Sequence, residues 1–274
     1  MNGLIIRNIS NDYTVLSGNK TYMCKSRGKF RNLKITPLVG DKVIFDDKQK
    51  YIMEISPRTN FLVRPPMANI DQTIIVTSVV EPDFSTNLLD KLILVVESSH
   101  IKPVICLTKL DLLNDKFDIN KYINYYKSIG YEVYRNDQLK ALESIFKDKI
   151  TVLAGQSGSG KSTLLNKFSP VLNLKTDIIS KALGRGKHTT RHIELIPLLE
   201  GFIADTPGFS SIDLTSISKN IIRDSFVEFN LYKDHCEYKD CMHNLEINCE
   251  IKRKVKEGKI LESRYENYLK FLKG

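Results

Sequence analysis

A glycine-rich segment in the middle of the chain has the spacing of a phosphate-binding loop. It follows an apolar run at 150–154 that predicts a buried strand, and it precedes a helical stretch at 162–168. Glycines let successive N–H groups point at one phosphate cluster, and the helix N-terminus adds its partial positive charge. Lys161 can reach the terminal phosphates, and Ser162 can offer its hydroxyl to Mg²⁺. The predicted phosphate-binding residues, in the pattern G-x-x-x-x-G-K-[ST], are Gly155, Gln156, Ser157, Gly158, Ser159, Gly160, Lys161, Ser162 and Thr163.

A second short motif, Thr108-Lys109-Leu110-Asp111, ends a predicted strand at 102–108. A carboxylate here can accept both the N1–H and the N2 amino protons of guanine, a donor pair that adenine lacks, so Asp111 would select GTP and GDP. Lys109 can lay its aliphatic stem along the purine. By itself this motif is equally an ordinary helix start, and the phosphate loop favours the base-binding interpretation. Thr108 replaces the Asn that is commoner in GTPases, which removes an amide tie to the phosphate loop and predicts weaker affinity.

A third motif, Asp205-Thr-Pro-Gly208, closes a predicted strand at 202–205. Asp205 is expected to hold Mg²⁺ through water, and the Gly208 N–H is expected to meet the γ-phosphate. The next residue, where Ras-type GTPases use a glutamine to orient water, is Phe209, which cannot do so. We therefore predict slow intrinsic hydrolysis that another group completes.

A basic, hydroxyl-rich segment at 184–191 lies between the phosphate loop and this third motif. Thr189 or Thr190 could offer a hydroxyl and a carbonyl to Mg²⁺ and the γ-phosphate. His188 could position or deprotonate water near neutral pH. The alternatives for His188 are an ordinary loop residue and an RNA phosphate contact.

The order of these motifs is unusual, because the base motif at 108 precedes the phosphate loop at 155. Ras-like GTPases place the phosphate loop first. The order therefore predicts a circularly permuted nucleotide-binding domain.

Four residues near the end of the chain have the spacing of metal ligands: Cys236, Cys241, His243 and Cys249. Three thiolates and one imidazole suit a tetrahedral Zn²⁺ with every position filled, so its role would be structural. His235 could compete as a ligand, and a disulfide is the alternative use of the thiols. Cys24 and Cys106 stand in strand-like runs and are predicted to be buried hydrophobes.

The 274-residue chain carries a formal net charge of +9, and much of it lies at the front. Residues 1–62 hold eleven Lys and Arg against five Asp and Glu, in short β-like runs that predict a small barrel. Cations mixed with Tyr22 and Phe30 suit phosphate contact and base stacking on an OB-type surface. A solvated basic loop is the alternative. The cations are Lys20, Lys25, Arg27, Lys29, Arg31 and Lys34.

The middle of the chain alternates strand-like and helix-like segments. Strands at 72–80, 102–108, 150–154, 191–198 and 202–205, with helices at 86–98 and 162–168, predict a parallel sheet covered on both faces. After Thr215 the periodicity is helical. No apolar run approaches the roughly 18 residues that span a bilayer, and the first residues lack a signal-peptide plan, so we expect a cytoplasmic protein without a membrane partner. One late helical stretch is expected to place Leu261, Tyr265, Tyr268, Leu269 and Leu272 on one face.

Taken in order, the motifs resemble the RsgA (YjeQ/YloQ) family of ribosome small-subunit-dependent GTPases. The resemblance rests on NIDQ at 69–72, LLDK at 88–91, TKLD, GQSGSGKST, GRGKHTT, DTPGF and the Cys/His spacing. It implies a multidomain α/β chain with an OB-type barrel at 1–62, a circularly permuted P-loop GTPase domain at 63–214 and an α-helical zinc domain at 215–274. The family spacing favours His243 over His235 as the ligand.

The resemblance also implies a function in late maturation of the small ribosomal subunit. A monomer would bind ribosomal RNA when GTP is bound, and the subunit would stimulate hydrolysis. One departure is residues 134–137, Tyr-Arg-Asn-Asp, which lack the family's usual base contact and leave the fifth nucleotide element unassigned. Two alternatives stay open: an RNA-binding assembly factor in which hydrolysis is secondary, and a GTPase of the large subunit. The barrel and the Cys3His tail argue against the latter.

Overall fold

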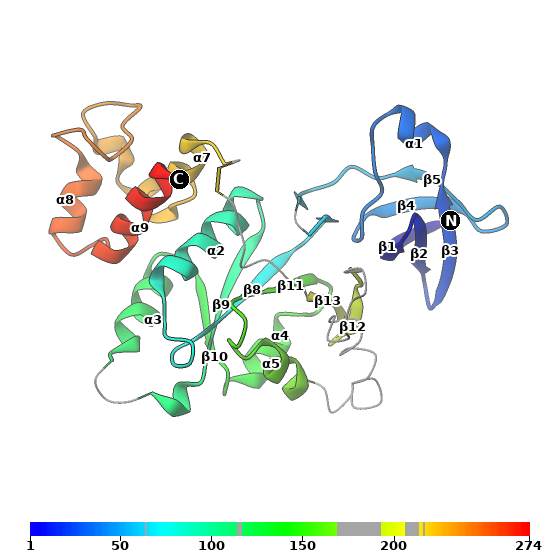
Figure 1. Cartoon of the computed structure of the whole chain (residues 1–274), viewed down its shortest axis with the longest axis horizontal. Coiled ribbons are helices and arrows are strands. Elements are labelled where there is room, and N and C mark those ends of the chain that lie inside the picture. Colours follow the sequence, from blue (N-terminus) through cyan, green and yellow to red (C-terminus); the bar gives the residue numbers. More distant parts are fainter. Residues whose placement is uncertain (64, 114–116, 169–192, 206–213, 216) are drawn as a thin grey trace. The chain divides into compact units, whose positions relative to one another are not determined.

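The computed structural model describes residues 1–63, 65–113, 117–168, 193–205, 214–215 and 217–274 (Figure 1). The chain forms two compact units. The first contains Met1–Ile74, Gln138–Ala154 and Lys161–Phe209, and the second contains Ile75–Asp137, Gly155–Gly160 and Ser210–Gly274. The predicted segment at 184–191 and residues 206–209 lie outside the described residues.

The front of the first unit is a closed five-stranded barrel in the order β1-β2-β3-β5-β4 (Figure 1). Alternate side chains of the strands point inward, and Ile5, Val15, Phe45 and Ile52 are almost fully buried. The predicted small barrel is thereby confirmed. The strands are β1 (Asn2–Ile9), β2 (Asp12–Ser17), β3 (Lys20–Ser26), β4 (Lys42–Asp46) and β5 (Tyr51–Ile55).

The expected stacking role of Phe30 is wrong. Phe30 lies in a short helix, α1 (Gly28–Asn32), and is buried, with 5% of the residue exposed. Tyr22 packs against Phe45 with ring centroids 5.0 Å apart, and Lys50 Nζ lies 4.8 Å from the centroid of the Tyr22 ring. Phe30 fills the core because a small barrel needs large apolar side chains to bury enough surface.

A six-stranded sheet follows, in the order β10-β9-β8-β11-β13-β12. β10 pairs with β9 in parallel and β11 with β13 in parallel, whereas β12 is antiparallel to β13. The sequence missed β10, and the strand expected at 191–198 is described only from residue 193 and is shorter. The strands are β8 (Gln72–Ser78), β9 (Lys102–Thr108), β10 (Glu132–Arg135), β11 (Ile150–Ala154), β12 (Ile196–Leu198) and β13 (Gly201–Asp205), with a small hairpin of β6 (Phe61–Leu62) and β7 (Met67–Ala68) before them.

Helices cover this sheet, and β8, β9 and β11 are buried along nearly their whole length. α2 (Thr86–Ser98) begins where the Ser85 side chain accepts a hydrogen bond from the Leu88 N–H, and α3 (Ile119–Ser128) begins at Asp118 in the same way. α4 (Leu139–Ser144) and α5 (Lys161–Phe168) pack on each other in the first unit. Among the described residues, no helix has the length and hydropathy that a membrane crossing needs.

The last part of the second unit is helical, as predicted, and packs on α2. Leu94 of α2 joins a core with Phe226, Phe229 and Tyr268. Helical periodicity places Tyr268 and Leu272 inside as expected, but it missed the buried polar residue Arg264. The elements are α7 (Lys219–Asp224), η3 (Val227–Leu231), η4 (Lys233–His235), α8 (Glu250–Lys256) and α9 (Glu262–Lys273).

Candidate nucleotide and metal sites

The predicted phosphate loop joins β11 to α5. Its three glycines all adopt positive φ, at +143° for Gly155, +80° for Gly158 and +91° for Gly160. A Cβ at Gly155 would lie 2.1 Å from the Val76 carbonyl oxygen, so no larger residue fits there. Lys161, Ser162 and Thr163 form the first turn of α5, with Thr163 the most exposed of them.

The base motif contacts the phosphate loop. Thr108 ends β9, is buried, and donates from its hydroxyl to the Ser159 carbonyl oxygen at 2.7 Å. A Cβ at Gly160 would lie 3.5 Å from the same hydroxyl oxygen. The expectation that threonine removes the tie between the two loops is wrong, because the Thr108 hydroxyl donates to a carbonyl as an amide would.

The rest of the base motif turns away from the strand. Lys109 has a left-handed backbone at φ +58°, and Leu110 and Asp111 begin the one-turn helix η1 (Leu110–Leu112). The Asp111 side chain is exposed, so a base can approach it from solvent. The Lys109 amine donates to the Glu81 carbonyl, in a loop whose Pro82 lies against Gly158. The lysine that was expected along the purine is thus held beside the phosphate loop.

Asp205 ends β13 opposite Leu153 of β11, two residues before the phosphate loop begins. Its backbone therefore reaches the carboxyl edge of the parallel pair, where α/β sheets present ligand-binding residues. The other residues predicted to contact Mg²⁺, the γ-phosphate or the attacking water lie outside the described residues. They are His188, Thr189, Thr190 and Gly208.

The segment that the sequence left unassigned lies beside the base motif. Arg135 of β10 is in register with Leu107 of β9, and the Asn136 N–H donates to the Leu107 carbonyl at 2.9 Å. Arg135 also forms an ion pair with Asp137 at 3.5 Å. The only sequence signal for β10 is the four-residue run Glu-Val-Tyr-Arg, in which one residue is buried. A strand so short and so polar is hard to distinguish from a loop.

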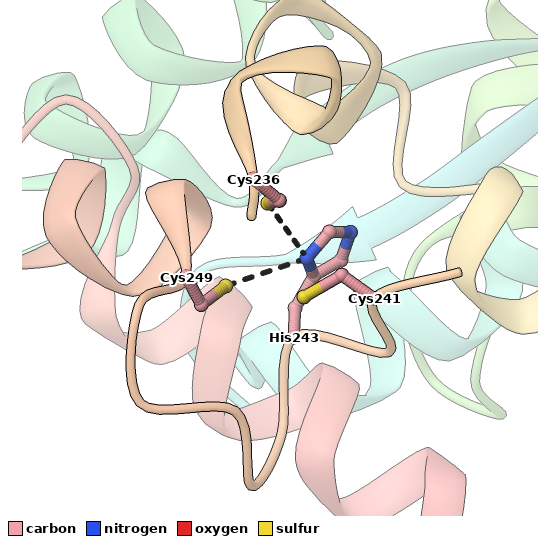
Figure 2. A group of neighbouring side chains, drawn as sticks. All are labelled: Cys236, Cys241, His243 and Cys249. Atoms are coloured by element: carbon pink, nitrogen blue, oxygen red, sulfur yellow. Dashed lines mark hydrogen bonds between the residues drawn. The ribbon is translucent and has the colours of Figure 1, made fainter. Parts of the chain in front are cut away.

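The four predicted metal ligands come together in the second unit (Figure 2). The ligand atoms of Cys236, Cys241, His243 and Cys249 all lie within 4.8 Å of one another. His243 Nδ1 faces Cys249 Sγ at 3.4 Å and Cys236 Sγ at 3.6 Å. His235 is exposed and stands outside this group. The five cysteines are free thiols, so the disulfide alternative is not supported.

The electrostatics of this cluster fit a cation. Burial lowers the pKa of His243 to about 4, which keeps its imidazole neutral and able to coordinate. Burial and the neighbouring thiols raise the pKa of Cys241, and burial raises that of Cys249. The sulfurs of Cys241 and Cys249 therefore keep their protons until a metal replaces those protons. Three sulfurs and one imidazole nitrogen fit one structural Zn²⁺ with no open position.

The C-terminal helix α9 supports the ligand loop. The Tyr265 hydroxyl donates to the His243 carbonyl at 2.7 Å, and the Tyr268 hydroxyl donates to the Met242 carbonyl at 2.5 Å. Both bonds satisfy carbonyls next to the ligands and fix the His243 backbone, which has φ +55°. Helix α9 therefore holds the ligand loop in place through two hydrogen bonds, in addition to any bonds of its residues to a metal.

Helix α9 is also tied to α2 by a buried ion cluster. Arg264, 1% exposed, donates to both oxygens of Glu228 at 2.8 and 2.9 Å and to Asp90 Oδ1 at 2.9 Å. Burial raises the pKa of Asp90, while Arg264 acts in the opposite direction. The cluster links the metal-bearing segment to α2, which follows the loop whose Pro82 lies against Gly158.

Comparisons with known proteins agree with this geometry. The family model described as RsgA GTPase matches residues 55–215, and the RsgA N-terminal domain matches residues 2–52. A protein of Oceanobacillus iheyensis named small ribosomal subunit biogenesis GTPase RsgA 2 is 50% identical, covering 98% of this chain and 96% of its own. An Enterococcus faecalis protein named small ribosomal subunit biogenesis GTPase RsgA is 48% identical, over 99% of this chain and 94% of its own.

Two solved structures are similar along the whole chain. YloQ, described as a circularly permuted GTPase, superposes with a TM-score of 0.84 at 40% identity, covering 99% of this chain and 93% of that one. YjeQ from Thermotoga maritima superposes with a TM-score of 0.83 at 32% identity, covering 99% and 96%. The permuted order predicted from the motifs is therefore confirmed. On these grounds the chain belongs to the RsgA family of GTPases.

Proposed function

We propose that this protein hydrolyses GTP during late maturation of the small ribosomal subunit, and that its nucleotide state controls its binding to that subunit. The observation that carries this proposal is the 2.7 Å bond from Thr108 to Ser159, which sets the base motif against the phosphate loop despite their reversed order. The names of the two relatives, small ribosomal subunit biogenesis GTPases, supply the subunit.

Each group of residues would bind a different part of the nucleotide. Asp111 accepts from the guanine edge, and the N–H groups of residues 155–160 meet the phosphates, as helix N-termini and nests do. Lys161 neutralises the terminal phosphates, while Ser162 and Asp205 would hold Mg²⁺. That ion, when bound, offsets the charge that develops on the phosphate oxygens.

The switch assignments stay predictions. Residues 184–191 and 205–209 would dock on the γ-phosphate through Thr189 or Thr190 and Gly208. Because Phe209 offers no hydrogen bond to an attacking water, hydrolysis by the isolated protein is slow. His188 or a group of the subunit then completes the site.

The proposed division is a barrel at 1–62, a GTPase domain at 63–214 and a zinc domain at 215–274, in a monomeric cytoplasmic protein. The barrel would contact ribosomal RNA mainly through phosphates, since Phe30 is buried and Lys20, Lys25 and Lys29 are exposed. Such a contact weakens steeply with added salt.

The first test is steady-state GTP turnover with and without purified small subunits. We expect slow turnover alone and a marked increase with subunits, and no increase with large subunits. Equal turnover in all three conditions would contradict the regulatory part of the proposal. Stimulation by large subunits alone would indicate a GTPase that acts on the large ribosomal subunit.

The second test replaces the base-selecting carboxylate. Asp111→Asn removes two hydrogen bonds of about 1.5–3 kcal/mol each, which lowers GTP affinity by several powers of ten. The new amide can donate to the extra carbonyl of xanthine, so xanthosine triphosphate should be hydrolysed instead. Asp148→Asn, an exposed aspartate in a turn after α4, is the matched control and should change neither activity. If D111N keeps full function in subunit maturation, hydrolysis is secondary and the protein is an RNA-binding assembly factor.

A further inference from the structure

Two aliphatic side chains stand out from the metal loop into solvent. Leu245 is 86% exposed and Ile247 is 91% exposed, the two largest values among the exposed large hydrophobic side chains of the described residues. Both lie between the ligands His243 and Cys249. Single exposed apolar residues are common, but two this exposed and one residue apart on a ligand-bearing loop call for a reason.

The loop that carries the pair is held by several hydrogen bonds. The carboxylate of Glu246, the residue between them, turns inward and accepts the N–H groups of Met242 at 2.6 Å and Asn244 at 2.8 Å. Lys252 donates to the Glu246 carbonyl at 2.7 Å. Inward anchoring of the central residue directs its two neighbours outward, and a preordered loop loses little conformational entropy when it binds.

The segment that carries the pair is acidic. Residues 234–248 hold four carboxylates and one lysine, whereas the chain carries +9, and Lys252 of α8 adds one cation beside Glu246. Glu237, exposed, accepts from Asn248 at 2.8 Å and so lies next to Ile247, and a Cys3His site with Zn²⁺ adds a further net negative charge. Such a segment is less suited to contact RNA phosphates than the cationic barrel is, since RNA recognition uses cations and stacking planes.

We infer that Leu245 and Ile247 form a protein-docking tip that inserts into an apolar recess on a basic protein of the small ribosomal subunit. This inference rests on the proposed function and adds to it a division of labour. The cationic barrel would contact RNA, and the acidic, apolar-tipped metal loop would contact protein. An apolar centre with a polar rim of complementary charge is a common form of protein interface.

The test compares L245S/I247S with L231S, which removes a leucine that is 62% exposed on η3 of the same segment. Binding to purified small subunits is measured by co-sedimentation, with zinc content and intrinsic GTP turnover as checks of folding. We expect L245S/I247S to raise Kd about tenfold or more. L231S should leave Kd unchanged, and both variants should keep their metal and their basal turnover.

A crosslink identifies the partner. The photoreactive amino acid p-benzoylphenylalanine at position 247 is irradiated in the complex, and the adduct is digested with nuclease or protease. An adduct with a basic protein supports the inference; an adduct with RNA, or unchanged binding of L245S/I247S, overturns it. Failure of the unaltered protein to bind small subunits would instead remove the proposed function itself, and the inference with it.

Discussion

The hydroxyl of Thr108 offers a sharp test of how the two nucleotide loops are held together. Thr108→Val keeps the shape of the side chain and removes the donor to the Ser159 carbonyl at 2.7 Å. Because Thr108 is 3% exposed, water cannot easily replace the lost donor. Removing one partner of a buried hydrogen bond costs about 1–3 kcal/mol.

If this loss falls on nucleotide binding, the affinity for GDP drops roughly 5- to 150-fold, since 1.4 kcal/mol is tenfold. Isothermal titration calorimetry with GDP and Mg²⁺ measures it directly. Thr108→Ser retains the hydroxyl and should remain near the unaltered affinity. Wild-type affinity for T108V would refute the reasoning, because the bond would then be irrelevant to the arrangement of the loops.

Three further predictions concern the rest of the chain. Arg264→Met leaves Asp90 and Glu228 buried without their cation and should lower the free energy of unfolding by about 3–5 kcal/mol, whereas Arg253→Met, whose side chain is 63% exposed, should cost about 0–1 kcal/mol. Burial raises the pKa of Asp90, and more so without Arg264. The folded state therefore favours the protonated carboxyl, and the R264M loss measured by urea denaturation should be larger at pH 8 than at pH 5. Removing zinc with a chelator should lower the melting temperature of the C-terminal segment in far-UV circular dichroism, and Zn²⁺ but not Mg²⁺ should restore it; an unchanged melting curve would contradict a structural metal. Gly155→Ala places a Cβ 2.1 Å from the Val76 carbonyl and should abolish GDP binding, while Gly28→Ala, which has open space around it, should bind normally.

The sequence alone identified the parts of the molecule whose chemistry is local. A phosphate loop is a run of consecutive residues, and four metal ligands within fourteen residues must meet wherever that segment folds. The same holds for the barrel strands, whose alternating pattern records which side faces the core. Motif order was sufficient to predict the permutation, because chain order is itself a property of the sequence.

Tertiary structure decided what depends on distant segments. The contact of Thr108 with Ser159 spans 51 residues, and that of Arg264 with Asp90 spans 174, so neither leaves a local pattern. Residues 134–137 gained a place beside the base motif only through the pairing of β10 with β9. The sequence around Phe30, which is rich in cations, predicts a stacking ring on the surface. In the folded chain Phe30 lies in a five-residue helix and is buried. Burial and long-range pairing are properties of the packed chain, and the same residue type can serve a surface or a core until packing settles which.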